Sequence, residues 1–303
     1  MLNLLQESFG RLYRYKTFRV CLIIITAIPL FFNGLEKMLM ETNDFPDVST
    51  ADDYLFNVYG MLPLIIAIAA GLFVIKDFKE NTVRNKLICG YTRTQVYVVN
   101  WITAVFIAVF YHLFSTLVCT VSASILLEPG DLFTKVNAYY ELISIPTLIS
   151  YTSITVMMAM IFRTTASAIF SYFIHAVIIM FEPLIVHKVD NDSFTRFSSM
   201  FVPENQLYII SSRCYSDPTK SGGILNMFDD VKYAIPEGNA AYLIPLYALL
   251  LAAVVTVIGI IHFNKRTSNN LYQSPYASVY GDFSAVFSVY FKNISQNNHI
   301  RPI

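Results

Sequence analysis

Apolar residues in this chain gather into six continuous stretches separated by polar segments. Each stretch is long enough for a helix to cross the hydrocarbon core of a bilayer, which takes about 20 residues. None alternates apolar and polar residues as barrel strands do, so we predict membrane helices. The predicted spans are residues 19–35, 54–75, 96–126, 139–162, 165–187 and 240–263.

Composition agrees with an all-α integral membrane protein. Hydrophobic types make up 55% of the 303 residues and charged types only 14%, against about 25% charged residues in soluble domains. The net charge of zero argues against a nucleic-acid partner. The four cysteines are far apart in the sequence and form no C-x-x-C pair, so neither a metal site nor a disulfide framework is predicted.

The charge distribution predicts the topology. With both termini in the cytoplasm, 14 of the 21 basic residues lie inside and 7 lie outside, whereas 4 acidic residues lie inside and 17 outside. Lysine and arginine favour the cytoplasmic side. The sequence therefore predicts a multi-pass protein of the cell membrane, with a transmembrane domain over residues 19–266.

Three segments outside the spans have their own patterns. Residues 1–18 place Leu2, Leu5, Phe9 and Leu12 at helical steps, which predicts an amphipathic helix on the inner leaflet. Residues 188–239 form a long outer segment, predicted to contain short re-entrant or interfacial helices. The cytoplasmic tail, residues 267–303, has regularly spaced aromatic residues that favour either the inner membrane surface or a partner subunit.

The cytoplasmic loop between the second and third spans predicts a short helix. Val83, Leu87 and Ile88 form an apolar stripe, and the polar side is expected to hold Lys79, Arg84 and Lys86. Gly90 can adopt a positive φ angle and end this helix. Thr92 and Gln95 have the spacing of a capping box that starts the next helix. The loop is thus either a structured interfacial turn or a docking element for a cytoplasmic partner.

Catalytic motifs are lacking. No glycine precedes a lysine, so the chain has no Walker A sequence, and no nucleophile elbow or zinc-protease motif occurs. We therefore expect no enzymatic activity, no metal and no cofactor on this chain. Ionisable residues inside spans are functional candidates by default; here they are His112, Glu141, His175 and Glu182. Ala67 with Gly71, and Ser167 with Ser171, have the small-residue spacing that permits close helix approach.

The cytoplasmic loop resembles that of ABC-2 type permeases, the membrane subunits of ATP-binding-cassette exporters. In that family the loop commonly reads E-x-x-x-G-T-I-R-N-x-L-x-x-G-x-S-R-x-Q-I-Y. Asn81 stands where the family usually has glycine. The turn around Arg163 and Thr164 is similar to the family's second cytoplasmic link. The residues that fit the loop pattern are Thr82, Arg84, Asn85, Leu87, Gly90, Arg93, Gln95 and Tyr97.

The resemblance implies a function. Two such permeases, as a homodimer or a heterodimer, would pair with two ATPase subunits that bind ATP and Mg. A hydrophobic or amphipathic substrate, with an antimicrobial peptide as the leading candidate, would be exported. The implied coupling residues are Lys79, Glu80, Thr82, Val83, Arg84, Asn85, Leu87, Ile88, Gly90 and Arg93, and the implied translocation-path residues are Tyr59, Leu62, Ile66, Phe73, Phe170, Phe173 and Ile174.

Two other functions remain as alternatives. A gradient-driven secondary transporter would depend on the ionisable residues named above. A membrane sensor or scaffold without transport would use the outer segment to bind a ligand and the cytoplasmic loop to bind a signalling partner.

Overall fold

The computed structural model describes residues 1–41, 61–127, 135–173, 177, 203, 206 and 243–270. All regular secondary structure in these residues is helical. By internal contacts the chain divides into a unit Met1–Ile260 and a unit Ile261–Ile303. Most of the outer segment and the tail from residue 271 lie outside the described residues, so the predictions made for them stay predictions.

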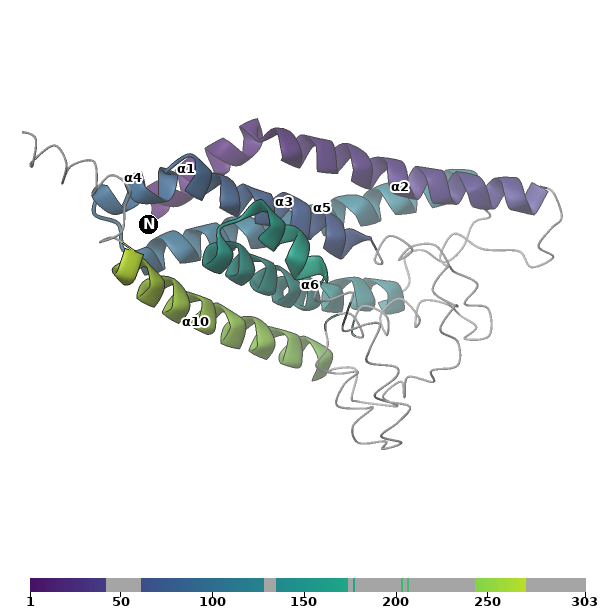
Figure 1. Cartoon of the computed structure of the whole chain (residues 1–303). Coiled ribbons are helices and arrows are strands. Elements are labelled where there is room, and N and C mark those ends of the chain that lie inside the picture. Colours follow the sequence, from purple (N-terminus) through teal and green to yellow (C-terminus); the bar gives the residue numbers. More distant parts are fainter. Residues whose placement is uncertain are drawn as a thin grey trace, which may run out of the picture. The chain divides into compact units, whose positions relative to one another are not determined.

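Seven helices have defined bounds, and a further helical segment covers residues 165–173. The seven helices, shown in Figure 1, are α1 (Leu2–Arg14), α2 (Lys16–Glu41), α3 (Leu62–Lys79), α4 (Thr82–Ile88), α5 (Arg93–Leu126), α6 (Lys135–Phe162) and α10 (Ile244–Asn270).

Within the described residues, four helical stretches are long and apolar enough to cross a membrane: Lys16–Leu35, Arg93–Leu126, Glu141–Phe162 and Ile244–Lys265. They overlap the first, third, fourth and sixth predicted spans. The second predicted span overlaps α3, whose 18 residues include the charged Lys76, Asp77 and Lys79. The described part of the fifth is residues 165–173 and Val177. The described part of the chain is thus all-helical and typical of a membrane-embedded protein, and the count of six spans stays a prediction.

Helix α5 is the centre of the bundle and packs against α1, α2, α3 and α6 (Figure 1). Polar side chains link these neighbours. Asn33 Nδ2 donates to Ser122 Oγ at 2.7 Å, and Trp101 Nε1 donates to Ser153 Oγ at 2.8 Å. Such hydrogen bonds satisfy polar groups that have no water partner in a bilayer.

Helix α3 lies close to the helical segment 165–173. A Cβ atom placed at Gly71 would be 2.6 Å from Ala168 Cβ and 3.3 Å from Thr155 Cγ2. Next to this contact, Ser171 Oγ lies 3.4 Å from Thr155 Oγ1. Gly71 and Ser171, two of the small residues noted in the sequence, therefore lie at a close contact between helices.

Helix α1 is amphipathic, as the sequence predicts, but its buried stripe differs from the predicted one. Leu4, Ser8 and Leu12 are buried, whereas Leu2 is 81% exposed. The helix ends at Arg14, and Tyr15 is extended before α2 begins at Lys16. The reason for the shift is that α1 packs on α5, so its core-facing side is set by that neighbour.

Candidate functional site

The link between α3 and α5 has a defined conformation. Asn81 precedes α4 with a φ of 55°, and Gly90 follows it with a φ of 90°. Asparagine and glycine are the residues that best tolerate this left-handed region. The predicted capping box is confirmed: Gln95 N donates to Thr92 Oγ1 at 3.2 Å, and Thr92 N donates to Gln95 Oε1 at 2.9 Å. The start of α5 is therefore stabilised by local hydrogen bonds, and the two turns of the link occur at residues that tolerate them.

One side of α4 faces outward. Arg84, Asn85 and Ile88 are exposed, and we call these three residues the α4 outer face. Ile88 is 72% exposed although it is apolar, and Cys89 beside it is an exposed free thiol. Val83 is buried against the bundle. Apolar residues and arginine are common in protein interfaces, so the α4 outer face is a candidate docking surface.

The other side of α4 enters a buried ion cluster. Lys86, which the sequence placed on the polar side, is only 4% exposed. Its Nζ lies 3.1 Å from Oδ2 of Asp77, which is fully buried at the end of α3. Arg11 of α1 donates to both oxygens of Asp77, with Nη2 at 3.1 Å from Oδ2. Lys86 is buried because this carboxylate compensates its charge.

Glu7 of α1 completes this group of charges. Its Oε1 lies 3.5 Å from Arg11 Nε and 4.0 Å from Lys86 Nζ. We call Glu7, Arg11, Asp77 and Lys86 the Asp77 cluster; it contains two carboxylates and two cations. Burial acts to lower the pKa of Arg11, but hydrogen bonds to Asp77 and the charges of Asp77, Glu7 and Glu80 outweigh it and raise that pKa. Arg11 therefore stays protonated.

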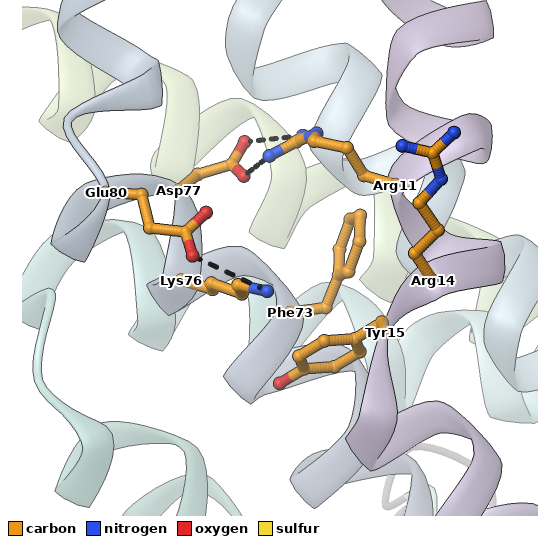
Figure 2. A pocket seen from close by; sticks show the side chains of 7 residues that line it. All are labelled: Arg11, Arg14, Tyr15, Phe73, Lys76, Asp77 and Glu80. Atoms are coloured by element: carbon orange, nitrogen blue, oxygen red, sulfur yellow. Dashed lines mark hydrogen bonds and ion pairs between the residues drawn. The ribbon is translucent and has the colours of Figure 1, made fainter.

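A small open hollow lies beside the cluster (Figure 2). In this view Asp77 faces Arg11, whereas Lys76 faces Glu80. The Lys76–Glu80 pair is about half exposed, with 3.5 Å between Nζ and Oε1, and such surface pairs contribute little stability. Burial raises the pKa of Tyr15, whose ring packs edge-on against Phe73. The hollow, of about 210 Å³, is lined by Arg11, Arg14, Tyr15, Phe73, Lys76, Asp77 and Glu80.

The second predicted cytoplasmic link lies against the end of α3. Lys79 Nζ donates to Thr165 Oγ1 at 2.7 Å. Arg163, with a φ of 58°, places its guanidinium carbon 5.2 Å from the centre of the Phe78 ring. Thr164 follows Arg163, and its carbonyl accepts from Ser167. Two links that are about 80 residues apart in the sequence therefore meet at one helix end.

The remaining predicted coupling residues surround α4. Lys79, Glu80 and Gly90 are exposed, and Thr82, Leu87 and Arg93 are partly buried. The loop motif thus includes exposed residues before, within and after α4.

Two predicted intramembrane residues are in contact. His112 Nε2 lies 3.0 Å from Glu141 Oε1, and Thr116 Oγ1 donates to the same carboxylate oxygen at 2.8 Å. Ser144 Oγ lies 2.8 Å from His112 Nε2. His175 and Glu182 lie outside the described residues. Ionisable groups inside membranes commonly pair with one another in this way.

The predicted path residues divide into two groups. Leu62, Ile66 and Phe73 of α3 are buried inside this chain. Phe170 and Phe173, in contrast, are 56% and 61% exposed. Tyr59 and Ile174 lie outside the described residues. In the single chain, the exposed candidates therefore come from the segment 165–173.

Sequence reasoning missed Arg11 and Asp77 as functional candidates and misplaced Lys86. One signal was available: acidic residues are rare on the predicted cytoplasmic side, where only Glu7, Asp77, Glu80 and Asp282 occur. Three of these four form ion pairs around the hollow. An acidic residue that stands among many basic residues on the cytoplasmic side is therefore a candidate for a structural ion pair.

Comparisons with known proteins do not identify a family: no protein-family model matches the chain, and no curated protein matches it. Within the described residues, no group of three or more histidine, cysteine, aspartate or glutamate side chains could hold a metal ion.

Proposed function

We propose that this chain is the membrane subunit of an ATP-driven exporter of the ABC-2 type, and that α4 is the helix through which a separate ATPase acts on it. The observation that carries the proposal is the α4 outer face. It is a short, exposed helix surface joined to α3 and α5 through links with defined turns. A helix held in this way can pass a displacement to membrane helices, because packed elements move as rigid bodies.

Two further observations support the proposal. Asn81 has a positive φ at the position where the resembled family has glycine. The second link, at Arg163 and Thr164, lies against the same end of α3. An ATPase bound at α4 would then contact both links. The ATPase would bind ATP and Mg, two copies would serve a permease dimer, and both termini of this chain would be cytoplasmic.

A hydrophobic or amphipathic cargo, such as an antimicrobial peptide, fits the exposed aromatic residues of the segment 165–173 better than an ion does. Phe170 and Phe173 offer apolar contact area, and aromatic side chains bury large surfaces. A second subunit would pack near the same segment, as a homodimer or a heterodimer.

The first test concerns the α4 outer face. We expect Arg84→Glu and Ile88→Asp each to weaken ATPase binding at least tenfold, since removal of a central interface residue commonly costs about 2 kcal/mol or more. The chain is purified in mild detergent from its host, and co-purifying Walker A proteins are identified by mass spectrometry. ATPase activity is then measured with wild type and variants.

Cys89 provides an independent readout of the same surface. It is exposed, whereas Cys21 and Cys119 are buried. With Cys214→Ser as background, maleimide labelling therefore reports on Cys89. We expect ATPase binding to slow this labelling in wild type and in Arg14→Glu, a matched charge reversal outside α4, but not in Arg84→Glu. Equal protection in both charge-reversal variants would refute α4 as the docking surface.

The contact between His112 and Glu141 favours one alternative, a gradient-driven transporter. Trp101 is the single tryptophan and lies between the same two helices, α5 and α6. Its fluorescence in proteoliposomes therefore reports on their relative movement. We expect ATP with the partner ATPase to change this emission, and a pH gradient alone to leave it unchanged.

The control for this measurement is Glu141→Gln, which removes the charge of the pair but keeps its size. An emission change driven by the gradient alone, and lost in Glu141→Gln, would favour the gradient-driven transporter over the exporter.

A further inference from the structure

We infer that Asp77 joins α4 to α1, so that the two short helices move together when a partner presses on the α4 outer face. The role of the partner rests on the proposed function; the joining of the helices does not. Asp77 would thus be a positioning residue for coupling, and Lys86 would act inside the protein although it belongs to α4.

The first argument is that one carboxylate serves two helices. Arg11 of α1 and Lys86 of α4 both donate to Asp77, which is fully buried at the end of α3. Lys86 has almost no access to water. If either helix moved away alone, a buried charge would lose its partner, and such a state is strongly unfavourable.

The second argument is that Glu7 makes an additional connection between the same helices. Its carboxylate approaches Arg11 within α1 and Lys86 in α4. The four charges therefore form a closed arrangement instead of one isolated pair. Because Glu7 is nearly half exposed and its contacts are ion pairs of 3.5 and 4.0 Å, they supplement the connection that the buried Asp77 makes between the two helices.

The third argument concerns what α1 is attached to. Only Tyr15 separates α1 from α2, which begins at Lys16. A displacement of α1 therefore acts directly on the first membrane helix. The links on either side of α4 reach only α3 and α5. Through Asp77, a displacement of α4 would also reach α1 and α2, so that it would act on α2, α3 and α5 at once.

The experiment uses the purified full chain in lipid nanodiscs without any ATPase. Backbone hydrogen–deuterium exchange is followed by mass spectrometry in α1 and α4. We expect Lys86→Met to raise exchange at least tenfold in both helices, although the substitution lies only in α4, because Arg11 alone must then balance the carboxylates of both Asp77 and Glu7, and local opening is governed by the contacts that are lost. We expect Asp77→Asn to raise exchange in both helices further, and Lys86→Arg to restore near-wild-type exchange.

Lys79→Met is the matched control. It removes a lysine from the same region, but one that is exposed and bonded to Thr165 instead of Asp77. We expect exchange in α1 and α4 to stay within twofold of wild type. If Lys86→Met raises exchange in α4 alone, the inference is wrong. Lys86→Met is decisive even if Asp77→Asn fails to fold, because it leaves Asp77 paired with Arg11.

A second measurement separates a coupling role from a merely structural one. With the ATPase added, Cys89 of the Lys86→Met chain should still be protected from maleimide labelling. The stimulation of ATP hydrolysis by this chain should, however, fall by at least four-fifths relative to wild type. Full stimulation in a Lys86→Met chain with loosened α1 would overturn the coupling role. Absence of Cys89 protection in the wild-type chain would instead refute the proposed function and leave the exchange result standing.

Discussion

Replacing Gly71 with leucine is expected to prevent assembly of the helix bundle. Even a single Cβ at this position would lie 2.6 Å from Ala168 Cβ and 3.2 Å from Ala168 Cα. The nearest atoms belong to a helix backbone and a short side chain, so they cannot rotate away. Overpacking of this kind costs about 1–3 kcal/mol and more for larger side chains. The measurement is the yield of monodisperse protein in detergent and its melting temperature.

Gly34→Leu is the matched control for this prediction. Gly34 also lies inside a helix, α2, but no atom is within 4 Å of a Cβ placed there. Leucine is also a much better helix former than glycine. We expect Gly34→Leu to purify and melt like wild type. A difference of 2 °C in melting temperature corresponds to roughly 0.5–1 kcal/mol in a domain of 150–250 residues. A Gly71→Leu protein whose melting temperature lies within 2 °C of that of Gly34→Leu would contradict the close contact between α3 and residues 165–173.

The second large effect is expected at Gly259 of α10. A Cβ there would lie 2.7 Å from Cζ of Tyr97 and closer still to its phenol oxygen. Tyr97 is fully buried, so its ring has little room to move. We expect Gly259→Ala to lower the melting temperature, at a cost of about 1–3 kcal/mol.

A double variant tests whether this contact is the cause. Tyr97→Leu removes the ring atoms that collide with the new methyl group. The combined effect of Tyr97→Leu and Gly259→Ala should therefore be smaller than the sum of the single effects, as expected for residues in contact. Strict additivity of the two changes in melting temperature would argue against a direct contact between Tyr97 and Gly259.

Helix α3 connects these structural features to the proposed coupling. Its middle carries Gly71, which lies in close contact with Ala168. Its end carries Asp77, which pairs with α1 and α4, and Lys79, which contacts the second link. Through α3, a displacement of α4 would therefore reach both α1 and the segment 165–173 with its exposed aromatic residues. This arrangement supports the idea that α3 distributes movement among its neighbours.

Local features of the link around α4 were predictable from the sequence because they depend on neighbouring residues. Thr92 and Gln95 are three positions apart, and their reciprocal hydrogen bonds form within one helical turn. Gly90 adopts its positive φ for the same local reason. Within α4, spacing correctly placed Val83 toward the bundle and Arg84 outside, but it misplaced both Ile88, which is exposed, and Lys86, which is buried.

The Asp77 cluster was not predictable in this way. Arg11 and Asp77 are 66 positions apart, and no spacing rule relates them. Lysine on a short loop helix is ordinarily solvated, so its burial depends on a carboxylate that the fold brings close. The contact between His112 and Glu141 has the same origin: both were recognised as unusual membrane residues, but their pairing depends on how α5 and α6 pack.

The sequence by itself determined that this protein is helical and membrane-embedded, because continuous apolar runs of sufficient length leave a chain no other way to satisfy its backbone hydrogen bonds in lipid. It also determined the ends of the link around α4. Only the tertiary structure decided which charges are buried together, which stripe of α1 faces inward and which glycines lie at helix contacts. These properties depend on contacts between residues far apart in the chain, and such contacts form only when the helices pack together.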